Sequence, residues 1–400
     1  MLMGNLEFQA TDWIEIALGD ACTFRGGSGF SEAHQGHRSG DHPFIKVSDL
    51  TIAGNEKYIT TAQHWVSVAA LRELRATLQP AGAVVFPKVG AALKLNRRRI
   101  LLRPTAIDNN MMAAIPDRQK LDGEFLYYFL LTQDLGRFSQ ESAVPSVNQQ
   151  HLSSIEISLP PLPEQRKIAA ILRTWDEALE RLAALRAAKA RRLDGLRGRL
   201  IAAASRAGRP ATFGDVLTES REPGTDGATA RKISVRLYGK GAVEKDEPRG
   251  GSANTRYYRR RAGQIIWSKL DFLNGAFALI GPELDGLEST LDLPAFDCSE
   301  AVNPVWLIEY LTRPAYYTRQ VHLARGQRKA RRVSPEDWLA SPLRLPDRQT
   351  QDRIAAALSA GREELALLDA EIDALTRQKR GLMQKLLTGA WRVMPEEPVA

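Results

Sequence analysis

The sequence predicts a mixed α+β fold in which two similar globular domains are separated by two long helices that form an antiparallel coiled coil with pseudo-two-fold symmetry. Two observations predict it. The chain carries an internal duplication at a spacing of 186 residues, and each copy contains an apolar pattern typical of coiled-coil helices. We expect a first domain over residues 1–158, a spacer helix over 159–207, a second domain over 208–344, a second spacer helix over 345–391 and a tail over 392–400.

The duplication is clearest around two proline-containing junctions. Without a gap, the shift aligns Leu159-Pro160 with Leu345-Pro346, Gln165 with Gln351, and Gly195-Leu196 with Gly381-Leu382. Upstream, "VNQQHL" (147–152) aligns with "VSPEDW" (333–338), each opening a short helical turn with a polar residue. Nearer the N-terminus the offset becomes 181, where "AGAVVFPK" (81–88) matches "AGQIIWSK" (262–269). Because the offset changes, we expect loops of different length within two otherwise similar halves.

Each junction leads into a long helix. Proline suits only the first turn of a helix, so Pro161 and Pro163 place the first start near residues 161–164. Apolar residues then recur at the alternating spacings of a coiled-coil seam: Ile168, Leu172, Trp175, Leu179 and Leu182 in the first helix, and Ile354, Leu358, Leu365, Leu368 and Ile372 in the second. Roughly 40 residues give a rod about 60 Å long, which one small domain cannot cover. Each helix therefore needs a partner.

Charged residues beside the seam favour antiparallel pairing of these two helices. Such a pair brings a basic set in the first helix opposite an acidic set in the second, namely Arg186, Lys189, Arg191 and Arg192 opposite Glu363, Glu364, Asp369 and Glu371. The alternative is that each apolar stripe belongs to an ordinary amphipathic helix lying on its own domain. The regular duplication favours the pair, which would place like domains at opposite ends of a rod.

The composition is that of an ordinary globular protein with a moderate basic excess. Lys and Arg total 55 against 47 Asp and Glu, and the pI is about 9.5, so nucleic acid is one candidate partner. Cys22 and Cys298 are far apart and form no CxxC motif, which fits a reducing compartment. No apolar run approaches the ~18 residues of a membrane span, and the N-terminus lacks a signal-peptide pattern. We expect a cytoplasmic protein without membrane association.

A small set of strings in both halves points to one family. They are the junctions "ISLPPLPEQRKIAAIL" and "LRLPDRQTQDRIAAAL", the segments "VPSVNQQHLSSIEI" and "KARRVSPEDWLASPLRL" that lead into them, and the helix ends "GLRGRLI" and "GLMQKLLTG". These strings occur in a chain with the order domain, helix, domain, helix. In both respects the sequence resembles the specificity (S) subunit of type I restriction-modification systems over nearly its whole length. The second junction departs from the first, with Asp347-Arg348-Gln349 where the first has Pro161-Leu162-Pro163.

The resemblance implies a non-catalytic DNA-binding subunit with two target-recognition domains. Each domain would read one half of a bipartite, asymmetric site, and the helices would set the gap between the halves. Proteins with two-fold symmetry bind DNA half-sites about one helical turn (~34 Å) apart in the same way. It also implies docking, through Pro161, Pro163, Gln165 and the seams of both helices, to two DNA adenine methyltransferase subunits and to ATP-dependent restriction subunits. S-adenosylmethionine, Mg²⁺ and ATP would then belong to those partners, and this chain would hold no cofactor or metal.

Side-chain chemistry indicates which residues are candidates for DNA contact. Phosphates are bound by Lys, Arg and small polar groups, guanine is read by Arg or Lys, and adenine by Asn or Gln. In the first domain these residues are Arg25, Ser28, Lys88, Lys94, Asn96, Arg97, Asn148 and Gln149. In the second they are Arg256, Tyr257, Lys269, Arg325, Gln327, Arg328 and Arg331, from "NTRYYRRR", "AGQIIWSK" and "RGQRKARR". The alternative is that these basic runs are only solvated surface.

Enzyme signatures are weak in this chain. "NPVW" (303–306) lacks the second proline of the amino-methyltransferase loop and is better explained as a helix start, and no GxxxxGK[ST] loop is present. In "AHQGHRSGDH", His34, His37, Asp41 and His42 lack the paired spacing of a zinc site. The second hypothesis is nevertheless a stand-alone DNA nuclease or methyltransferase with a divergent active site.

Overall fold

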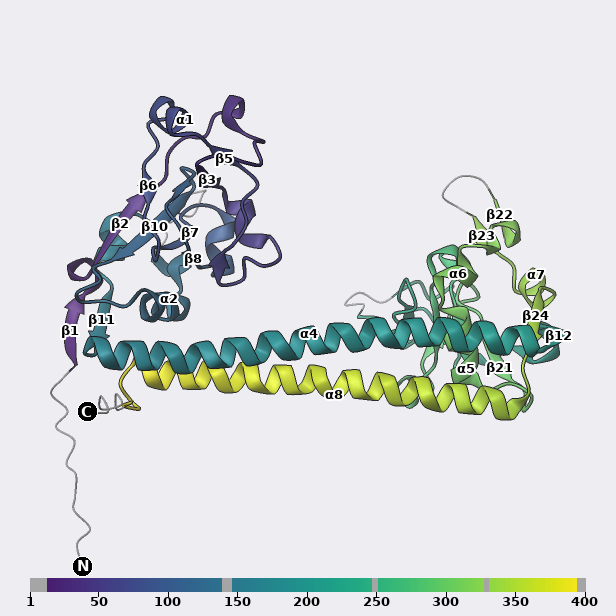
Figure 1. Cartoon of the computed structure of the whole chain (residues 1–400). Helices are drawn as coiled ribbons and strands as arrows, with labels where there is room; N and C mark the ends of the chain where they lie inside the picture. Colours follow the sequence, from purple (N-terminus) through teal and green to yellow (C-terminus); the bar gives the residue numbers. More distant parts are fainter. Residues whose placement is uncertain (1–12, 139–145, 247–250, 327–330, 394–400) are drawn as a thin grey trace, which may run out of the picture. The chain divides into compact units, whose positions relative to one another are not determined.

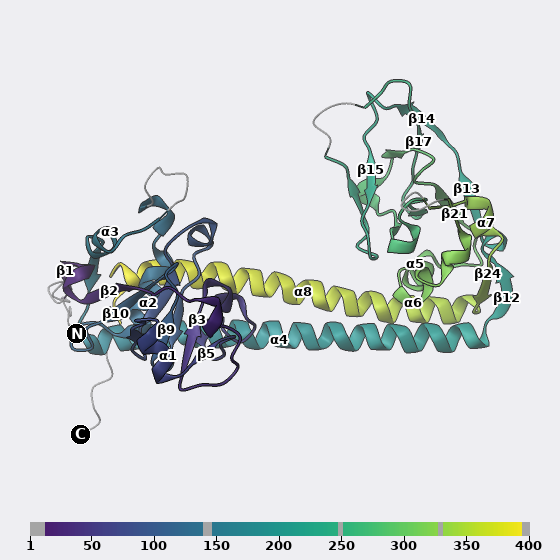
Figure 2. The ribbon, with the colours of Figure 1, turned by 90° about the horizontal axis from the view of Figure 1, so that it is seen from above.

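The computed structural model describes residues 13–138, 146–246, 251–326 and 331–393. It divides into two compact units, the first holding residues 1–182 and 371–400 and the second residues 183–370. Helices α4 (Leu162–Ala207) and α8 (Arg348–Leu387) each continue from one unit into the other. Each unit therefore combines one β-rich domain with a stretch of both helices (Figures 1 and 2).

The first domain is built around a sheet of strand order β2-β10-β7-β8-β4. Its strands are β2 (Cys22–Gly26), β4 (Tyr58–Ile59), β7 (Val84–Pro87), β8 (Arg99–Leu101) and β10 (Met111–Pro116). A second sheet, β5-β3-β9-β6, consists of β3 (His42–Ile45), β5 (Trp65–Val66), β6 (Leu78–Gln79) and β9 (Thr105–Ile107). Helices α1 (Val68–Glu73), α2 (Gly123–Thr132) and α3 (Gln149–Ser153) complete the domain. β7 is buried along its whole length, as its run of valine and phenylalanine predicts.

The second domain contains the matching sheet β13-β21-β18-β19. Its strands are β13 (Leu217–Ser220), β18 (Ile265–Trp267), β19 (Phe277–Leu279) and β21 (Ala295–Cys298). Smaller sheets are formed by β14 (Pro223–Asp226), β17 (Arg256–Arg259) and β20 (Glu288–Ser289), by β15 (Ile233–Val235) with β16 (Ala242–Glu244), and by β22 (Ala324–Arg325) with β23 (Arg332–Val333). The helices of this domain are α5 (Pro304–Leu311), α6 (Pro314–Tyr317) and α7 (Pro335–Leu339).

The duplication is visible at the edges of both domains. A two-stranded antiparallel pair closes each one: β1 (Ile14–Ala17) with β11 (Glu156–Leu159), and β12 (Arg209–Thr212) with β24 (Pro342–Leu345). β11 leads into α4 and β24 leads into α8. The prediction of two β-rich domains with two long packed helices is therefore confirmed.

A buried glutamine fixes each junction between a domain and its helix. The Gln165 side chain donates to the carbonyls of Pro160 and Lys120 at 2.7 and 2.8 Å, and its carbonyl accepts from the Asp122 amide at 2.8 Å. Gln351 makes the equivalent bonds to the Pro346 and Ala301 carbonyls and the Asn303 amide. Both glutamines are fully buried. The matching residues at the two junctions thus perform the same structural task.

The two hydrophobic cores each draw on both long helices. In the first unit, Ile168 and Leu172 of α4 pack in one cluster with Met383, Leu386 and Leu387 of α8. In the second, Ile354 and Leu358 of α8 pack with Ile201 and Ala204 of α4. The start of each helix thus lies on its own domain, as the amphipathic-helix alternative requires, but the end of the other helix packs there as well. The later seam residues Trp175, Leu179, Leu182, Leu365, Leu368 and Ile372 are half-buried.

Contacts between the helices show that they run antiparallel. In the first unit Asp176 pairs with Lys379. In the second unit Arg186 forms two bonds of 2.9 Å to Asp369, and Lys189 contacts Glu364 at 2.6 Å. The partner number in α8 falls as the number in α4 rises, so the predicted basic-to-acidic pairing is confirmed for these residues. No helix among the described residues combines the length and the apolar character that a membrane crossing needs.

The segment that follows α8 is bound to the start of α4 in the first unit. Glu164, only 4% exposed, accepts two bonds of 2.9 Å from the Arg392 guanidinium, one from the Val393 amide and one from the Trp13 indole. Gly389, with φ of +71°, lies against the Trp13 ring, where a β-carbon would come within 3.3 Å. This cluster joins residues that lie far apart in the sequence.

Candidate nucleic-acid interface

Two lysines occupy equivalent positions just beyond the central strands of the two domains. Lys88 follows β7, and Lys269 lies two residues beyond β18. The Lys88 amide donates to the Asn110 carbonyl and its carbonyl accepts from the Val147 amide, both at 2.9 Å. At Lys269 the same two bonds reach the Asp292 carbonyl and the Val333 amide, at 2.9 and 3.0 Å. The two backbones are therefore held alike, and each side chain is half-exposed.

Three polar segments of the first domain meet around Lys88. Val89 forms an isolated β-bridge with Ser146, and Gly26 lies so close that an added β-carbon would be 3.1 Å from the Lys88 ammonium. Gly27 is packed even more tightly, because a β-carbon there would be 2.0 Å from the Asp108 carbonyl. Only glycine allows this close approach. The structure thus brings together the segments 23–30, 87–99 and the described part of 142–150.

Around this point Arg25 is exposed and Ser28 is half-exposed. Arg25 lies in β2, and the Ser28 amide donates to the Ile107 carbonyl at 3.0 Å. Arg25 and Ser28 thus flank Gly26 and Gly27 in the segment that approaches Lys88.

The other candidates of the first domain divide into open and engaged side chains. Lys94 and Gln149 are exposed, and Arg97 is half-exposed. Asn96 adopts a left-handed conformation with φ of +50°, and its amide donates to the Leu131 carbonyl at 2.7 Å. Asn148 caps α3 by accepting from the His151 amide at 2.8 Å. Both asparagines thus have a structural bond that accounts for their presence.

The basic loop of the second domain is a hairpin formed by β22 and β23. Arg325 pairs with Arg332 across the hairpin backbone, and its side chain reaches Asp337 at 2.9 Å. Arg331 is exposed, whereas Gln327 and Arg328 lie outside the described residues. Sequence reasoning passed over Arg332, whose side chain contacts Asp292 at 3.1 Å and thereby lies beside the loop that holds Lys269. Only the three-dimensional position of Asp292 reveals that link.

Arg256 and Tyr257 lie on β17, the central strand of the sheet β14-β17-β20 in the same domain. Arg256 is exposed, and the Lys232 ammonium lies 5.5 Å from the centre of the Tyr257 ring. β17 also carries the exposed Arg259, and the fully buried Arg260 follows it. Arg260 donates to the Ser289 hydroxyl and the Ser220 carbonyl, at 2.7 and 2.8 Å. Burial lowers the pKa of Arg260 to about 10, so it stays charged at neutral pH and adds to the positive character of this strand.

The rejected enzyme motifs have ordinary structural explanations. Asn303 caps α5 by accepting from the amides of Val305 and Trp306 at 2.8 and 3.1 Å, which is the helix start expected from the sequence. His34 is bonded to Ser31 and Glu73. In the described part of the chain, no cluster of three or more His, Cys, Asp or Glu side chains is arranged to hold a metal ion.

Comparison with known proteins finds a sequence similarity over part of the chain. A model described as the type I restriction modification DNA specificity domain matches residues 10–187. The type I restriction enzyme MjaIX specificity subunit of Methanocaldococcus jannaschii is 25% identical over 174 residues, which are 42% of this chain and 39% of that protein. The matched part thus spans about two fifths of the length of this curated relative.

Solved structures extend the similarity to the whole fold. The type I restriction-modification S subunit from M. genitalium aligns with a TM-score of 0.55 and 14% identity, covering 97% of this chain and 98% of its own. A chain from a structure of complex assembly and conformational transition of the type I restriction-modification system aligns with a TM-score of 0.58 and 15% identity, covering 95% and 99%. Residues 10–187 thus match the DNA specificity domain of type I restriction-modification systems, and the fold of the chain is similar to that of a solved S subunit from such a system.

Proposed function

We propose that the chain binds double-stranded DNA with one domain on each half of a bipartite, asymmetric site. Residues 1–158 would read one half-site and residues 208–344 the other, with the helices at 159–207 and 345–391 between them. The observation that carries this proposal is the equivalent placement of Lys88 and Lys269 by the same pair of backbone hydrogen bonds. A lysine held at the same point in both domains suits contact with the repeating phosphates of DNA.

The asymmetry of the site follows from what surrounds these two lysines. Beside Lys88 lie Gly26, which packs against the Lys88 side chain, and Gly27, which packs against the Asp108 backbone. Beside Lys269 lies the ion pair of Arg332 with Asp292. Loops of different shape and charge present different groups to base edges, so the two half-sites would differ in sequence.

We further propose that this chain catalyses no reaction and delivers partners to DNA. These partners would be two DNA adenine methyltransferase subunits and ATP-dependent restriction subunits, which would bind S-adenosylmethionine, Mg²⁺ and ATP. Two docking places are supported by the duplicated junctions, where Gln165 and Gln351 make the same bonds, although Asp347-Arg348-Gln349 gives the second junction a different surface from the first. The neighbour from a type I assembly has the same fold as this chain.

Exchange of one domain tests the proposal. Residues 208–344 would be replaced by the corresponding block of another family member, and the variant expressed with its methyltransferase partner. Sequencing of methylated adenines should show one new half-site, an unchanged second half-site and an unchanged gap. A change in both half-sites would contradict the assignment of one domain to each half. Methylation or cleavage by the purified chain alone would favour the enzyme hypothesis instead.

A further inference from the structure

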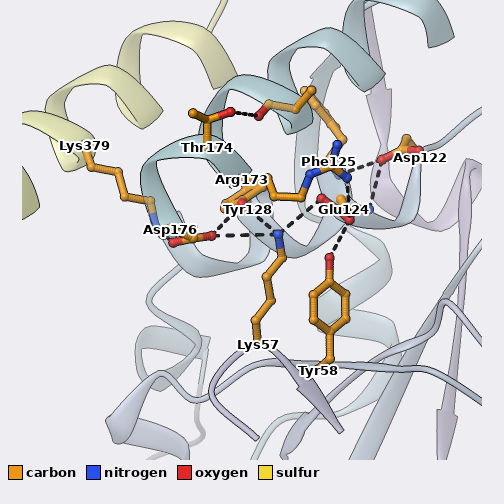
Figure 3. A network of polar contacts seen from close by, with 11 residues as sticks. Lys57, Tyr58, Asp122, Glu124, Phe125, Tyr128, Arg173, Thr174, Asp176 and Lys379 are labelled. Atoms are coloured by element: carbon orange, nitrogen blue, oxygen red, sulfur yellow. Dashed lines mark hydrogen bonds and ion pairs between the residues drawn. The ribbon is translucent and has the colours of Figure 1, made fainter. Parts of the chain in front are cut away.

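A buried polar cluster ties the end of α8 to the first domain and to α4 (Figure 3). At its centre the Lys57 ammonium, whose side chain is 8% exposed, lies 2.8 Å from the Tyr128 hydroxyl and 3.2 Å from Glu124. The Tyr128 hydroxyl donates to Asp176 of α4 at 2.6 Å, and Lys379 of α8 pairs with the same carboxylate. Asp176 is therefore held between cations from the domain and from α8.

Further bonds close this cluster on the domain side. Glu124, in the first turn of α2, accepts from the Tyr58 hydroxyl at 2.6 Å and from Arg173 of α4 at 3.2 Å. Burial alone would raise the pKa of Glu124, but its bonds to Tyr58, Lys57 and Arg173 outweigh burial and hold the pKa low. The cluster thus contains charged carboxylates that need their cations.

The second unit has a buried cluster at the corresponding place, but its charges are distributed differently. Here the anion is Glu309 of α5, whose side chain is 6% exposed. Arg197 of α4 contacts its carboxylate at 2.8 Å and also donates to its backbone carbonyl. Arg362 of α8 reaches the same carboxylate at 2.8 Å. The carboxylate therefore comes from the domain and both cations come from the helices.

The duplication shows that equivalent positions carry different residues. At the spacing of 186 residues, Asp176 of α4 corresponds to Arg362 of α8, and Leu193 of α4 to Lys379 of α8. Arg197 corresponds to Met383 in the same way. Equivalent positions of the two helices therefore carry side chains of different charge and size.

A tight contact in the second unit adds a steric difference. A β-carbon at Gly361 would lie 2.5 Å from the nearest methyl of Leu193, so the side chain of Leu193 occupies the space that Gly361 leaves. The position of α4 that corresponds to Gly361 is Trp175.

We propose that the residues of the helix interface make the first half of the chain, residues 1–207, pair selectively with the second half, residues 208–400, rather than with another first half. We call this set of residues the pairing code. If a second first half took the place of α8, Leu193 would replace Lys379 beside Asp176. Ala183 would face Arg186 where Asp369 now lies, and Trp175 would replace Gly361 against Leu193. Such a pair leaves the partly buried Asp176 carboxylate with one cation fewer and inserts an indole into a filled space.

A pair of second halves is equally mismatched. Met383 would replace Arg197 beside Glu309, whose carboxylate would keep only Arg362. Ile372 and Leu375 would face Asp369 and Glu364 in place of Arg186 and Lys189. Removing one partner of a buried ion pair is strongly destabilising, so we expect at least a ~100-fold preference for the mixed pair.

The test starts from the full chain with a protease site inserted after the exposed Ala207. After folding and cleavage, the two fragments would be unfolded together in urea, refolded by dilution and weighed as intact complexes by native mass spectrometry. Mixed pairs in large excess over same-half pairs are expected. Equal amounts of mixed and same-half pairs would overturn the proposal.

A second measurement does not depend on refolding of the fragments. In the uncut chain, Lys379→Leu and Arg197→Met each install the residue that the other helix carries at the equivalent position. Both variants should unfold at clearly lower urea concentration than the wild type. The matched controls are Arg192→Gln and Gln378→Arg, which exchange equivalent residues that are exposed in both helices. If Lys379→Leu and Arg197→Met unfold no earlier than the controls, no pairing code exists at these positions.

Discussion

The two lysines beyond the central strands give the sharpest expectation at the scale of single residues. We expect Lys88→Ala and Lys269→Ala each to weaken DNA binding about tenfold, because a hydrogen bond between charged groups contributes roughly 1.5 kcal/mol. Loss of one phosphate contact should also reduce the slope of log affinity against log salt by about 1. Fluorescence anisotropy of a labelled duplex, titrated with the assembled complex at several salt concentrations, measures both effects.

The control for this prediction removes the same charge elsewhere. Arg377→Ala takes away one exposed positive charge from α8, far along the chain from either lysine loop. Its binding curve should follow that of the wild type. If Arg377→Ala weakened DNA binding equally, the affinity would depend only on the net charge of the chain. The assignment of Lys88 and Lys269 as DNA contacts would then be wrong.

The candidate site was predictable as a set of segments but not as a set of contacts. Chemistry alone selected Lys88 and Lys269, and the duplication aligned them. The roles of Asn96 and Asn148 depend on a left-handed turn and a helix cap, which the choice of asparagine as an adenine reader ignored. Arg332 was missed because its partner Asp292 lies 40 positions away in the sequence and meets it only through the fold.

At the scale of structural elements, the buried glutamines determine how each helix joins its domain. We expect Gln165→Leu and Gln351→Leu each to lower the free energy of unfolding by about 3 kcal/mol, since each change leaves several buried backbone groups without a hydrogen bond. Urea denaturation followed by circular dichroism measures the loss. Gln378→Leu on the exposed face of α8 should leave the free energy of unfolding nearly unchanged. An equal loss of stability there would show that the junction hydrogen bonds contribute no more than an exposed side chain.

The cluster around Glu164 makes the stability of the chain depend on pH. Burial alone would raise the pKa of Glu164, but bonds from Arg392, the Val393 amide and Trp13 outweigh it and hold the pKa below its usual 4.5. Because the pKa is lowered in the folded state, the carboxylate stabilises the fold above about pH 4.5, and this contribution is lost as the pH falls through the lowered pKa.

The Glu164→Gln variant isolates this effect. Its free energy of unfolding should be lower than that of the wild type at neutral pH, and the difference should shrink as the pH falls below about 4.5. Urea titrations at stepped pH give both curves. Glu363→Gln, which changes an exposed carboxylate of α8, should run parallel to the wild type at every pH. A difference for Glu164→Gln that stays constant down to acid pH would exclude the carboxylate as its source.

Helices were easier to predict than the sheets they support. Proline at the junctions and regular apolar spacing indicated both α4 and α8, because those signals are local. Short strands such as β4 and β22, of two residues each, have no such signal and exist only through their neighbours. The burial of the charged residues Lys57 and Glu309 could not be predicted from the sequence for the same reason, because burial of a charge depends on partners from several elements.

At the scale of the whole molecule, each compact unit depends on both halves of the sequence. The first core contains the end of α8, and the second core contains the end of α4. Neither domain is therefore completed by its own half of the chain. An error in helix pairing would therefore damage both cores at once.

If the paired helices set the gap between half-sites, lengthening both should lengthen the gap. Seven residues inserted after Leu182 and seven after Ala370 add two helical turns, about 10 Å, and preserve the register of the seam. Since DNA rises about 3.4 Å per base pair, we expect the methylated sites to keep both half-sites and to gain about three base pairs between them. Methylome sequencing of cells that express the variant with its partners reads the gap directly. As a control, insertion into one helix alone should shift the Asp176–Lys379 contact out of register and destabilise the chain. An unchanged gap after the double insertion would show that the helices do not set the spacing.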